Sequence, residues 1–268
     1  MSSPPTPGRA TARPIADPTP HGAAASDPVA QDELARLRAE VDALREEQRT
    51  FAQGISHDLR APLRAIDTFA ALVEKDPALG EAARSHLARV RAAAGRMGGL
   101  LDGLLEFSRA GRVALEPRSV DLGLLAEWVV AELQEAEPSR EARIEIASGL
   151  DVVGDERLLK VLLAHLRGNA WKFSRDRDHV CIVVRGERTG DRLQVSIRDT
   201  GCGFEMAYAD KLFQPFQRLA GSEQGAGHGL GLATARRIVA RHDGTLRADS
   251  EPGVGSCFRF DLAVAPAG

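Results

Sequence analysis

The sequence predicts two folds in one chain of 268 residues: a helical hairpin that pairs with a second copy into a four-helix bundle, and an α+β domain that follows it. Two observations carry this prediction. Apolar residues recur at alternating steps of three and four through the first part of the chain, as they do in packed helices. Further on, helical segments are interspersed with short runs of alternating polar and apolar residues, which is typical of strands.

Residues 1–32 are expected to form a disordered tail. Seven prolines stand among Ala, Ser, Thr and Gly in the first 30 residues, and such a mixture cannot bury enough apolar area to offset its ordering entropy. From Leu34 a heptad pattern begins. It predicts a coiled-coil signalling helix over residues 33–54, through which two chains associate. A helix packed on its own domain is the alternative.

Helical periodicity continues to about Glu74, where "KDPALG" breaks it, and a second helix is predicted to run to about Ser108. Residues 55–112 are therefore predicted to form a helical hairpin. Its apolar stripes need more partner surface than one hairpin offers, so we expect a dimeric four-helix bundle.

The stretch "ISHDLRAPLRAI" at residues 55–66 sets His57 beside Asp58 on an otherwise apolar helical face. A neutral imidazole offers a ring-nitrogen lone pair, so His57 is a candidate nucleophile. Pro62 removes the hydrogen bond to the Asp58 carbonyl, and we expect the helix to bend there. The alternative is a histidine buried in the core.

The remaining residues, 113–264, are predicted to form the α+β domain. Asp121 is expected to cap one helix, and two more helices are predicted over about 156–173 and 230–242. In "RLQVSIRD", at residues 192–199, apolar and polar residues alternate. This pattern predicts a strand of a sheet that helices cover on one face only.

Three glycine-bearing stretches lie in this domain: "DTGCGF" at 199–204, "GAGHGLGLA" at 225–233 and "GVGSCF" at 253–258. Glycines before a helix let backbone N–H groups approach phosphates at the positive end of the helix dipole. A dinucleotide-binding fingerprint is disfavoured, because no strand leads directly into the second stretch. A plain helix turn is the remaining alternative.

Polar groups also share one face of the helix predicted over 156–173, where His165, Asn169 and Lys172 follow at steps of four and three. An amide oxygen can ligate Mg²⁺, and an ammonium can neutralise phosphate oxygens. This face therefore predicts a metal-nucleotide site. A solvated outer face would explain Lys172, but explains less well an asparagine within "NAWKF".

Composition limits the other classes of function. A net charge of −3 with 27% charged residues leaves no polybasic surplus, which argues against binding to nucleic acid or to an anionic membrane. The three cysteines are scattered, so neither disulfides nor structural zinc is expected. No apolar run approaches the roughly 20 residues of a membrane span. We therefore expect a cytoplasmic protein.

Five motifs, taken in order and at their spacings, resemble those of sensor histidine kinases, especially the transmitter modules attached to phytochromes and related PAS-containing kinases. They are "HDLRAPL" at 57–63, "HLRGNAWKF" at 165–173, "DTGCGF" at 199–204, "KLFQPFQRL" at 211–219 and "GHGLGLA" at 227–233. The resemblance covers about 33–262. It implies an α/β sandwich of the GHKL type that binds ATP, and it implies that His57 is an exposed phosphoacceptor with Asp58 as its base.

The resemblance also implies roles for single residues. Asp199 would accept the adenine amino group, while Lys172 and Arg218 would face the phosphates. Arg218 would do so from a mobile lid over about 208–228, anchored by Phe213 and Phe216. Asn169 would hold Mg²⁺. The full set of implied nucleotide-binding residues is Asn169, Lys172, Asp199, Gly201, Gly203, Phe213, Arg218, Gly227, Gly229, Gly231 and Gly255.

Two positions depart from the pattern of the family. His165 stands where many members carry an asparagine, which puts one polar contact near the ion in doubt. Ala61 stands where bifunctional members carry Thr or Asn, and its methyl group cannot orient an attacking water. We therefore expect weak phosphatase activity toward the partner.

The expected function is that of a homodimeric histidine kinase that phosphorylates itself from MgATP and passes the phosphoryl group to an aspartate of a response regulator receiver domain. A separate or fused sensor module would supply the signal. The main alternative is a non-catalytic dimeric scaffold that binds nucleotide, and His165 is its principal support. An ATPase or serine kinase that shares the nucleotide fold is a third reading, which the heptad-bearing hairpin disfavours.

Overall fold

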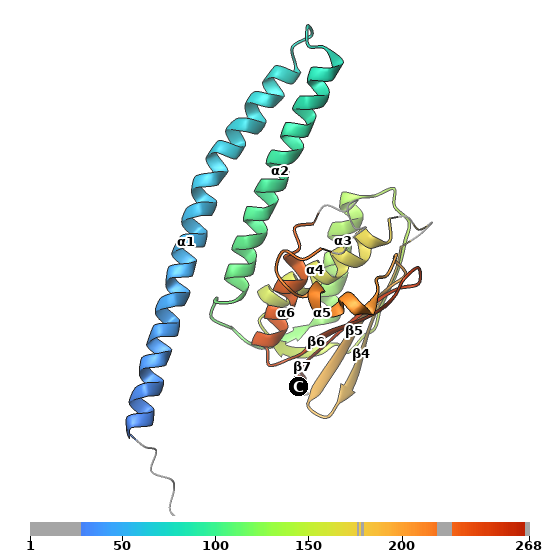
Figure 1. The fold of residues 1–268 in the computed structure, drawn as a ribbon. Coiled ribbons are helices and arrows are strands. Elements are labelled where there is room, and N and C mark those ends of the chain that lie inside the picture. The colour runs from blue at the N-terminus through green and yellow to red at the C-terminus, as the bar shows by residue number, and fades with distance from the viewer. Residues whose placement is uncertain (1–27, 176, 178–179, 219–226, 266–268) are drawn as a thin grey trace, which may run out of the picture. The chain divides into compact units, whose positions relative to one another are not determined.

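A computed structural model describes residues 28–175, 177, 180–218 and 227–265 of the chain (Figure 1). Most of the tail predicted over 1–32 lies outside the described residues. Its last part is helical, because the first helix, α1, already begins at Pro28. A proline is favoured in the first turn of a helix, where its missing N–H would have no partner.

The predicted hairpin consists of α1 (Pro28–Glu74) and α2 (Glu81–Ala110). Arg91 on α2 binds Asp67 and Glu74 on α1, with nitrogen–oxygen distances of 2.9 and 2.8 Å. These ion pairs hold the loop end of the hairpin together. Pro62 lies inside α1, which continues past it, and the bend expected there stays a prediction.

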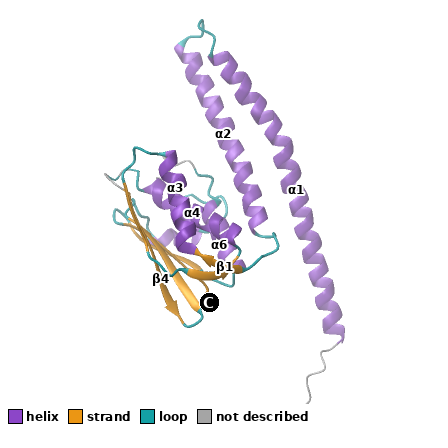
Figure 2. Cartoon of the chain, turned by 180° about the vertical axis from the view of Figure 1, so that it is seen from behind, coloured by secondary structure: helices purple, strands orange, loops and turns teal. Residues whose placement is uncertain are grey.

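A two-layer α/β domain follows the hairpin (Figure 2). Its elements are β1 (Arg118–Asp121), α3 (Leu122–Ala136), β2 (Ala142–Ile146), β3 (Asp151–Gly154), α4 (Glu156–Phe173), β4 (Val180–Thr189), β5 (Arg192–Asp199), the 3-10 helix η1 (Met206–Tyr208), α5 (Ala209–Leu212), α6 (Gly231–Arg241), β6 (Leu246–Glu251) and β7 (Gly255–Ala263).

The main sheet has five strands in the order β2-β4-β5-β7-β6, and β1 pairs with β3 in a separate two-stranded sheet. The pair β2-β4 is parallel, whereas the other pairs are antiparallel. Helices α3, α4 and α6 cover one face of the main sheet (Figure 1). Along β5, Leu193, Val195 and Ile197 are buried while Gln194 is exposed. The prediction of a strand covered on one face is confirmed.

Aspartates cap the N-termini of α3 and α4, two helices that follow one another in the sequence and pack on this sheet. The Asp121 carboxylate accepts the N–H groups of Gly123 and Leu124 at 2.8 and 3.1 Å, which confirms the cap predicted for α3. Asp155 accepts the N–H groups of Arg157 and Leu158 in the same way and caps α4. Such caps satisfy backbone donors that a helix leaves unpaired. The start of α4, which carries the predicted polar face, is thereby fixed.

Candidate functional site

His57 lies on α1 with 89% of its side chain exposed, as expected of a phosphoacceptor. Its Nδ1 atom is 3.2 Å from Oδ1 of Asp58, although the two residues are adjacent in the helix. A carboxylate can only accept a hydrogen bond, so a neutral ring in this pair carries its proton on Nδ1. The lone pair then lies on Nε2. Ala61, one turn further on, is also exposed and offers no hydrogen-bonding group.

Asn169 and Lys172 lie together near the end of α4, and both are half-buried. Burial lowers the pKa of Lys172, and the positive charges of Arg218 and Arg175 lower it further. No carboxylate among the described residues forms an ion pair with Lys172. A crowded ammonium group of this kind favours an anionic ligand.

Asp199 is the last residue of β5, and only 5% of the residue is exposed. Its Oδ1 atom accepts the N–H groups of Gly201 and Ser256, at 2.8 and 3.3 Å. Burial raises the pKa of Asp199, and these two hydrogen bonds oppose that shift. No partner for Oδ2 exists within the described part of the chain. This oxygen is therefore available to a donor group of a ligand.

Glycines bring the backbone after Asp199 close to its neighbours. Gly203 has a φ of +65°, and a Cβ atom there would overlap the carbonyl oxygen of Glu251. A Cβ atom on Gly201 would lie 2.7 Å from the carbonyl oxygen of Phe173, the last residue of α4. Only a residue without a side chain fits these approaches. The Asp199 loop is consequently pressed between the end of α4 and the β6-β7 hairpin.

The β6-β7 hairpin contributes a further glycine. Gly255 has a φ of +140°, and a Cβ atom on it would overlap the carbonyl oxygen of Asp199. The neighbouring Ser256 N–H is the second donor to Asp199. The motif "GVGSCF" therefore belongs to the same cluster as "DTGCGF", although Ser256 and Asp199 are 57 positions apart in the sequence.

The glycines before α6 meet the polar face of α4. A Cβ atom on Gly227 would lie 2.8 Å from Nζ of Lys172, and one on Gly231 would lie 2.9 Å from Nδ1 of His165. Among the described residues, no side chain caps the N-terminus of α6. Gly229, with a φ of +71°, passes so close to Gln217 that a Cβ atom would not fit. The open N-terminus of α6 and Lys172 together favour an anion at this point.

The predicted lid is only partly described, because residues 219–226 lie outside the described residues. Phe213 packs against the core of the α/β domain, as expected of an anchor. Phe216 does not, since it is 58% exposed. Its backbone is in the left-handed region, with φ of +64°, and its N–H donates to the carbonyl of Gly229 at 2.8 Å. The expected anchoring by Phe216 is wrong. Arg218 is exposed and close enough for its charge to affect Lys172.

His165 has a partner that the sequence did not indicate. Its Nε2 atom pairs with the carboxylate of Glu106 on α2. Because 59 residues separate the two, no local pattern could have joined them. Ser256 was missed for the same reason. Within the described residues no cluster of three or more His, Cys, Asp or Glu side chains could hold a metal ion.

Comparison with known proteins matches both parts of the chain to families. The model of the family "His Kinase A (phospho-acceptor) domain" matches residues 47–112. That of the family "Histidine kinase-, DNA gyrase B-, and HSP90-like ATPase" matches residues 154–266. The first range contains His57 and Asp58, and the second contains the cluster around Asp199 and Lys172.

Two relatives illustrate the likeness. The chain is 31% identical over 236 residues to the methanogenesis regulatory histidine kinase FilI of Methanothrix harundinacea, covering 87% of this chain and 26% of that protein. It is 27% identical over 235 residues to the phytochrome-like protein Cph1 of Synechocystis sp., covering 87% and 31%. The chain thus spans less than a third of either relative.

Among solved structures, full-length ShkA in complex with AMPPNP is similar to this chain with a TM-score of 0.60 and 28% sequence identity, covering 81% of this chain and 46% of that one. No helix in the described part of the chain is both long and apolar enough to cross a membrane.

Proposed function

Since this chain belongs to the family of sensor histidine kinases, we propose that it phosphorylates His57 from ATP and passes the phosphoryl group to an aspartate of a response regulator receiver domain. The observation that carries this proposal is the combination of two sites in one chain. An exposed histidine-carboxylate pair lies on the hairpin. In the α/β domain, a cluster contains a crowded ammonium and a carboxylate oxygen that has no partner among the described residues.

In the proposed complex, Oδ2 of Asp199 accepts the adenine amino group. Lys172, Arg218 and the N-terminus of α6 bind the phosphates, because all three carry positive charge or a positive dipole end. The amide oxygen of Asn169 is a suitable Mg²⁺ ligand, and no other hydrogen-bond partner within the described residues occupies it. Mg²⁺ usually takes one or two protein oxygens and completes its shell with water and phosphate oxygens. When bound, it would neutralise charge on the phosphates.

The proposed reaction starts from the neutral His57 ring. Its Nε2 lone pair forms a bond to the γ-phosphorus of ATP, while the bond from that phosphorus to the β,γ-bridging oxygen breaks and ADP leaves. The proton on Nδ1 is shared with Asp58, whose carboxylate stabilises the positive charge that develops on the ring. Asp58 can do so because its Oδ1 atom is already 3.2 Å from Nδ1.

His57 and the nucleotide cluster lie on separately folded parts joined by residues 111–117. We therefore infer that the α/β domain moves during the cycle to bring the γ-phosphate to Nε2. The proposed division of the chain is a coiled-coil signalling helix over 33–54, a dimerisation and phosphoacceptor hairpin over 55–112 and an ATP-binding domain over 113–264. A separate or fused sensor module would act on the first of these.

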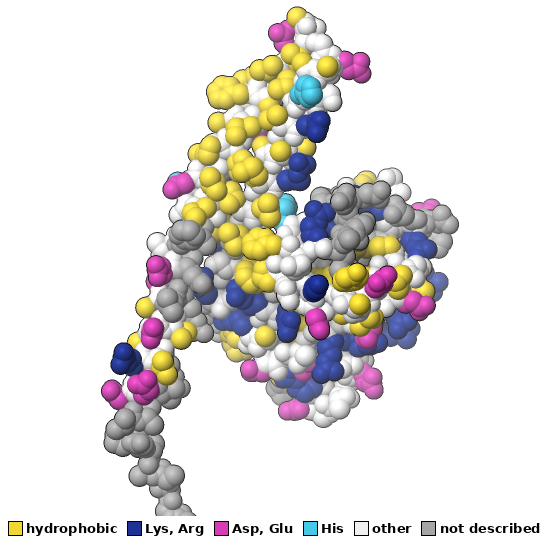
Figure 3. Space-filling model, in the orientation of Figure 1, with side chains coloured by type: hydrophobic (Ala, Val, Ile, Leu, Met, Phe, Trp, Pro, Cys, Tyr) yellow, Lys and Arg dark blue, Asp and Glu magenta, His cyan; other side chains and the backbone are white. Residues whose placement is uncertain are grey.

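We further propose that the hairpin forms a homodimer. Its visible face is largely hydrophobic (Figure 3). Between Ile55 and Ala110, the large exposed apolar side chains are Ile55, Leu59, Ile66, Phe69, Leu72, Val73, Val90, Met97 and Leu100. Soluble monomers rarely expose contiguous apolar patches of this kind. A second copy would cover them in a four-helix bundle.

Incubation of the purified chain with γ-labelled ATP and Mg²⁺ tests the kinase. We expect a phosphate that is stable in base and labile in acid, lost in His57→Gln and retained in His86→Gln. His86 is a matched control because it is an exposed histidine on α2 of the same hairpin. Equal labelling of both variants would refute the proposal. Nucleotide binding without any labelling would favour a non-catalytic scaffold instead, for which the replacement at His165 is the supporting observation.

A further inference from the structure

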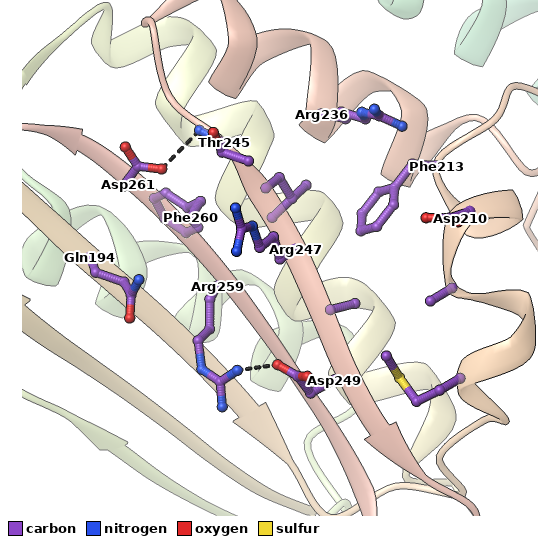
Figure 4. Close-up of a pocket in the computed structure, with 14 residues that line it drawn as sticks. Gln194, Asp210, Phe213, Arg236, Thr245, Arg247, Asp249, Arg259, Phe260 and Asp261 are labelled. Carbon is purple, nitrogen blue, oxygen red and sulfur yellow. Dashed lines mark hydrogen bonds and ion pairs between the residues drawn. The ribbon is translucent and has the colours of Figure 1, made fainter.

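A groove runs along one edge of the main sheet (Figure 4). Of the residues implied to bind nucleotide, Phe213 alone lines it. The groove has a volume of about 780 Å³. Strand β6, which is the last strand of the sheet, forms one wall. The opposite wall comes from η1, α5 and α6, through Met206, Asp210, Phe213 and Arg236. We call this feature the β6 edge groove.

The free edge of β6 presents backbone groups to this groove. The N–H of Ser250 donates to Sδ of Met206, at 3.3 Å, and so points away from β7. In an antiparallel ladder, alternate residues direct their N–H and C=O groups to the same side. Leu246 and Ala248 therefore also point theirs away from β7. No partner for these groups exists among the described residues.

The register of the sheet leads to the same assignment. A loop of two residues, Gly190 and Asp191, joins β4 to β5, and the residues flanking such a loop form a hydrogen-bonded pair. Arg192 and every second residue after it thus bond to β4, so that the intervening residues bond to β7. The registers of β5-β7 and β6-β7 allow this alternation to be followed from β5 to β6. It places the backbone N–H and C=O groups of Leu246 and Ala248 on the free edge.

The side chains around the groove add apolar surface and positive charge. Met206 is 46% exposed, and both Met206 and Phe213 line the groove. The Phe213 ring lies near Arg236 (Figure 4). Asp249 pairs with Arg259, and Asp261 pairs with Arg192. Of the remaining charged side chains of the groove, Arg236 and Arg247 form no ion pair within the described part of the chain. Among the described residues that line the groove, Asp210 is the one remaining acid that opposes these two charges.

We propose that the β6 edge groove docks an extended acidic peptide of a partner protein, which adds to the sheet as a sixth strand. An added strand gains affinity from main-chain hydrogen bonds and specificity from alternate side chains. Leu246 and Ala248 each offer one donor and one acceptor. Acidic side chains of the peptide reach Arg247 on the exposed face of β6, and apolar ones lie on Met206 and Phe213 on the opposite face. The charge of Arg236, on the same wall as Phe213, adds to the attraction. Only a short part of the peptide can pair with β6, because the N–H of Ser250 already donates to Met206.

A labelled peptide of alternating Glu and Val, seven residues long and blocked at both ends, tests this proposal by fluorescence anisotropy with the full chain. We expect saturable binding that AMPPNP does not displace. The variant Arg236→Ser with Arg247→Ser should bind the peptide about tenfold more weakly. The matched control, Arg143→Ser with Arg198→Ser, removes two exposed cations outside the groove and should bind normally.

Two control peptides separate strand addition from charge attraction. A fully N-methylated version keeps the side chains but has no backbone donors, and a Lys-Val version reverses the charge. Both should bind at least about tenfold more weakly. The proposal is overturned if the acidic peptide does not bind, if either control peptide binds equally well, or if AMPPNP competes with it.

Discussion

The hairpin and the α/β domain differ in how much of their apolar surface they bury alone. In the hairpin, one small buried cluster consists of Leu63, Ala94 and Leu101, while Phe69 and Leu72 are 66% and 56% exposed. The α/β domain has one continuous core between its sheet and its helices. Burial of apolar surface is the main source of stability. The difference indicates that the α/β domain is complete by itself, whereas the hairpin needs another surface.

The largest effect is expected from substitutions that disrupt the apolar contact between the hairpin and a second copy of it. Burying a Phe or Leu side chain contributes about 1.5–3 kcal/mol, and a buried carboxylate adds a further cost. The variant Phe69→Glu with Leu72→Glu should therefore raise the dissociation constant of the proposed homodimer by at least about a thousandfold. Sedimentation equilibrium measures it. The control, Lys75→Glu with Ala78→Glu, adds acidic groups in the loop between α1 and α2 and should leave the dimer intact.

The same double variant should not alter unfolding of the α/β domain. Both tryptophans of the chain, Trp128 and Trp171, lie in α3 and α4, so their fluorescence reports on this domain alone. A dimer that survives the double variant, or an α/β domain that loses stability with it, would contradict the comparison.

The second effect concerns close packing inside the α/β domain. Gly203→Ala should lower its free energy of unfolding by about 3 kcal/mol, through left-handed backbone strain plus overlap with Glu251. Gly190 has nearly the same φ, +63°, but open space around it. Gly190→Ala should thus cost only about 1 kcal/mol. Urea unfolding followed by tryptophan fluorescence compares them, and equal losses would show that the approach to Glu251 is unimportant.

The third effect depends on pH. The Arg157 guanidinium, together with the backbone N–H groups of Glu116 and Leu158, holds the pKa of Asp155 well below its usual range. A depressed carboxyl pKa stabilises the fold above the unfolded pKa of about 3.9, and this stability is lost as the pH falls further. Asp155→Asn should cost about 2 kcal/mol at pH 7.

Urea midpoints at several pH values measure this dependence. The difference between wild type and Asp155→Asn should shrink steadily as the pH falls below about 4. Asp151→Asn changes an exposed carboxylate nearby and should have little effect at any pH. A difference that stays constant down to the lowest pH would mean that Asp155 acts through its shape rather than its charge.

The smallest effect is a gain in stability. Arg167 is fully buried in α4, its Nη1 group donates to the carbonyl of Ala126, and its Nε and Nη2 groups have no partner among the described residues. Burial lowers the pKa of Arg167 to about 10. Arg167→Met keeps an unbranched stem without the charge, and should raise the free energy of unfolding by about 1 kcal/mol.

An exposed control, Arg188→Met, should change the free energy of unfolding by no more than about 0.5 kcal/mol. If Arg167→Met instead destabilises the α/β domain, the guanidinium has a stabilising role, and the core of this domain depends on a buried cation.

Local patterns predicted the helices well. Helix α4 has the bounds expected from the sequence, Glu156–Phe173, because an aspartate precedes its apolar repeat and both signals lie within one segment. The same holds for Asp121 and α3. The ends of the hairpin helices, predicted at about Glu74 and Ser108, also agree within a few residues with the observed ends at Glu74 and Ala110, since "KDPALG" interrupts the periodicity between the two helices.

Contacts between distant segments could not be predicted. Strands β1 and β3 have four residues each and pair only because the fold brings Arg118 opposite Gly154. The pair of His165 with Glu106, the second donor to Asp199 and the β6 edge groove have the same origin. Periodicity specifies which face of an element is apolar, but it does not specify which element that face meets.

The central claim is that the incomplete hairpin carries the nucleophile, while the complete α/β domain supplies the nucleotide. Mapping the phosphate after incubation with MgATP tests it most directly. Cleavage after Arg49 and Arg60 releases the segment "TFAQGISHDLR", residues 50–60. Mass spectrometry should find one acid-labile phosphate on this peptide, and none when Asn169→Ala is used. An acid-stable phosphate on its Thr50 or Ser56, or phosphate only on other peptides, would contradict the account.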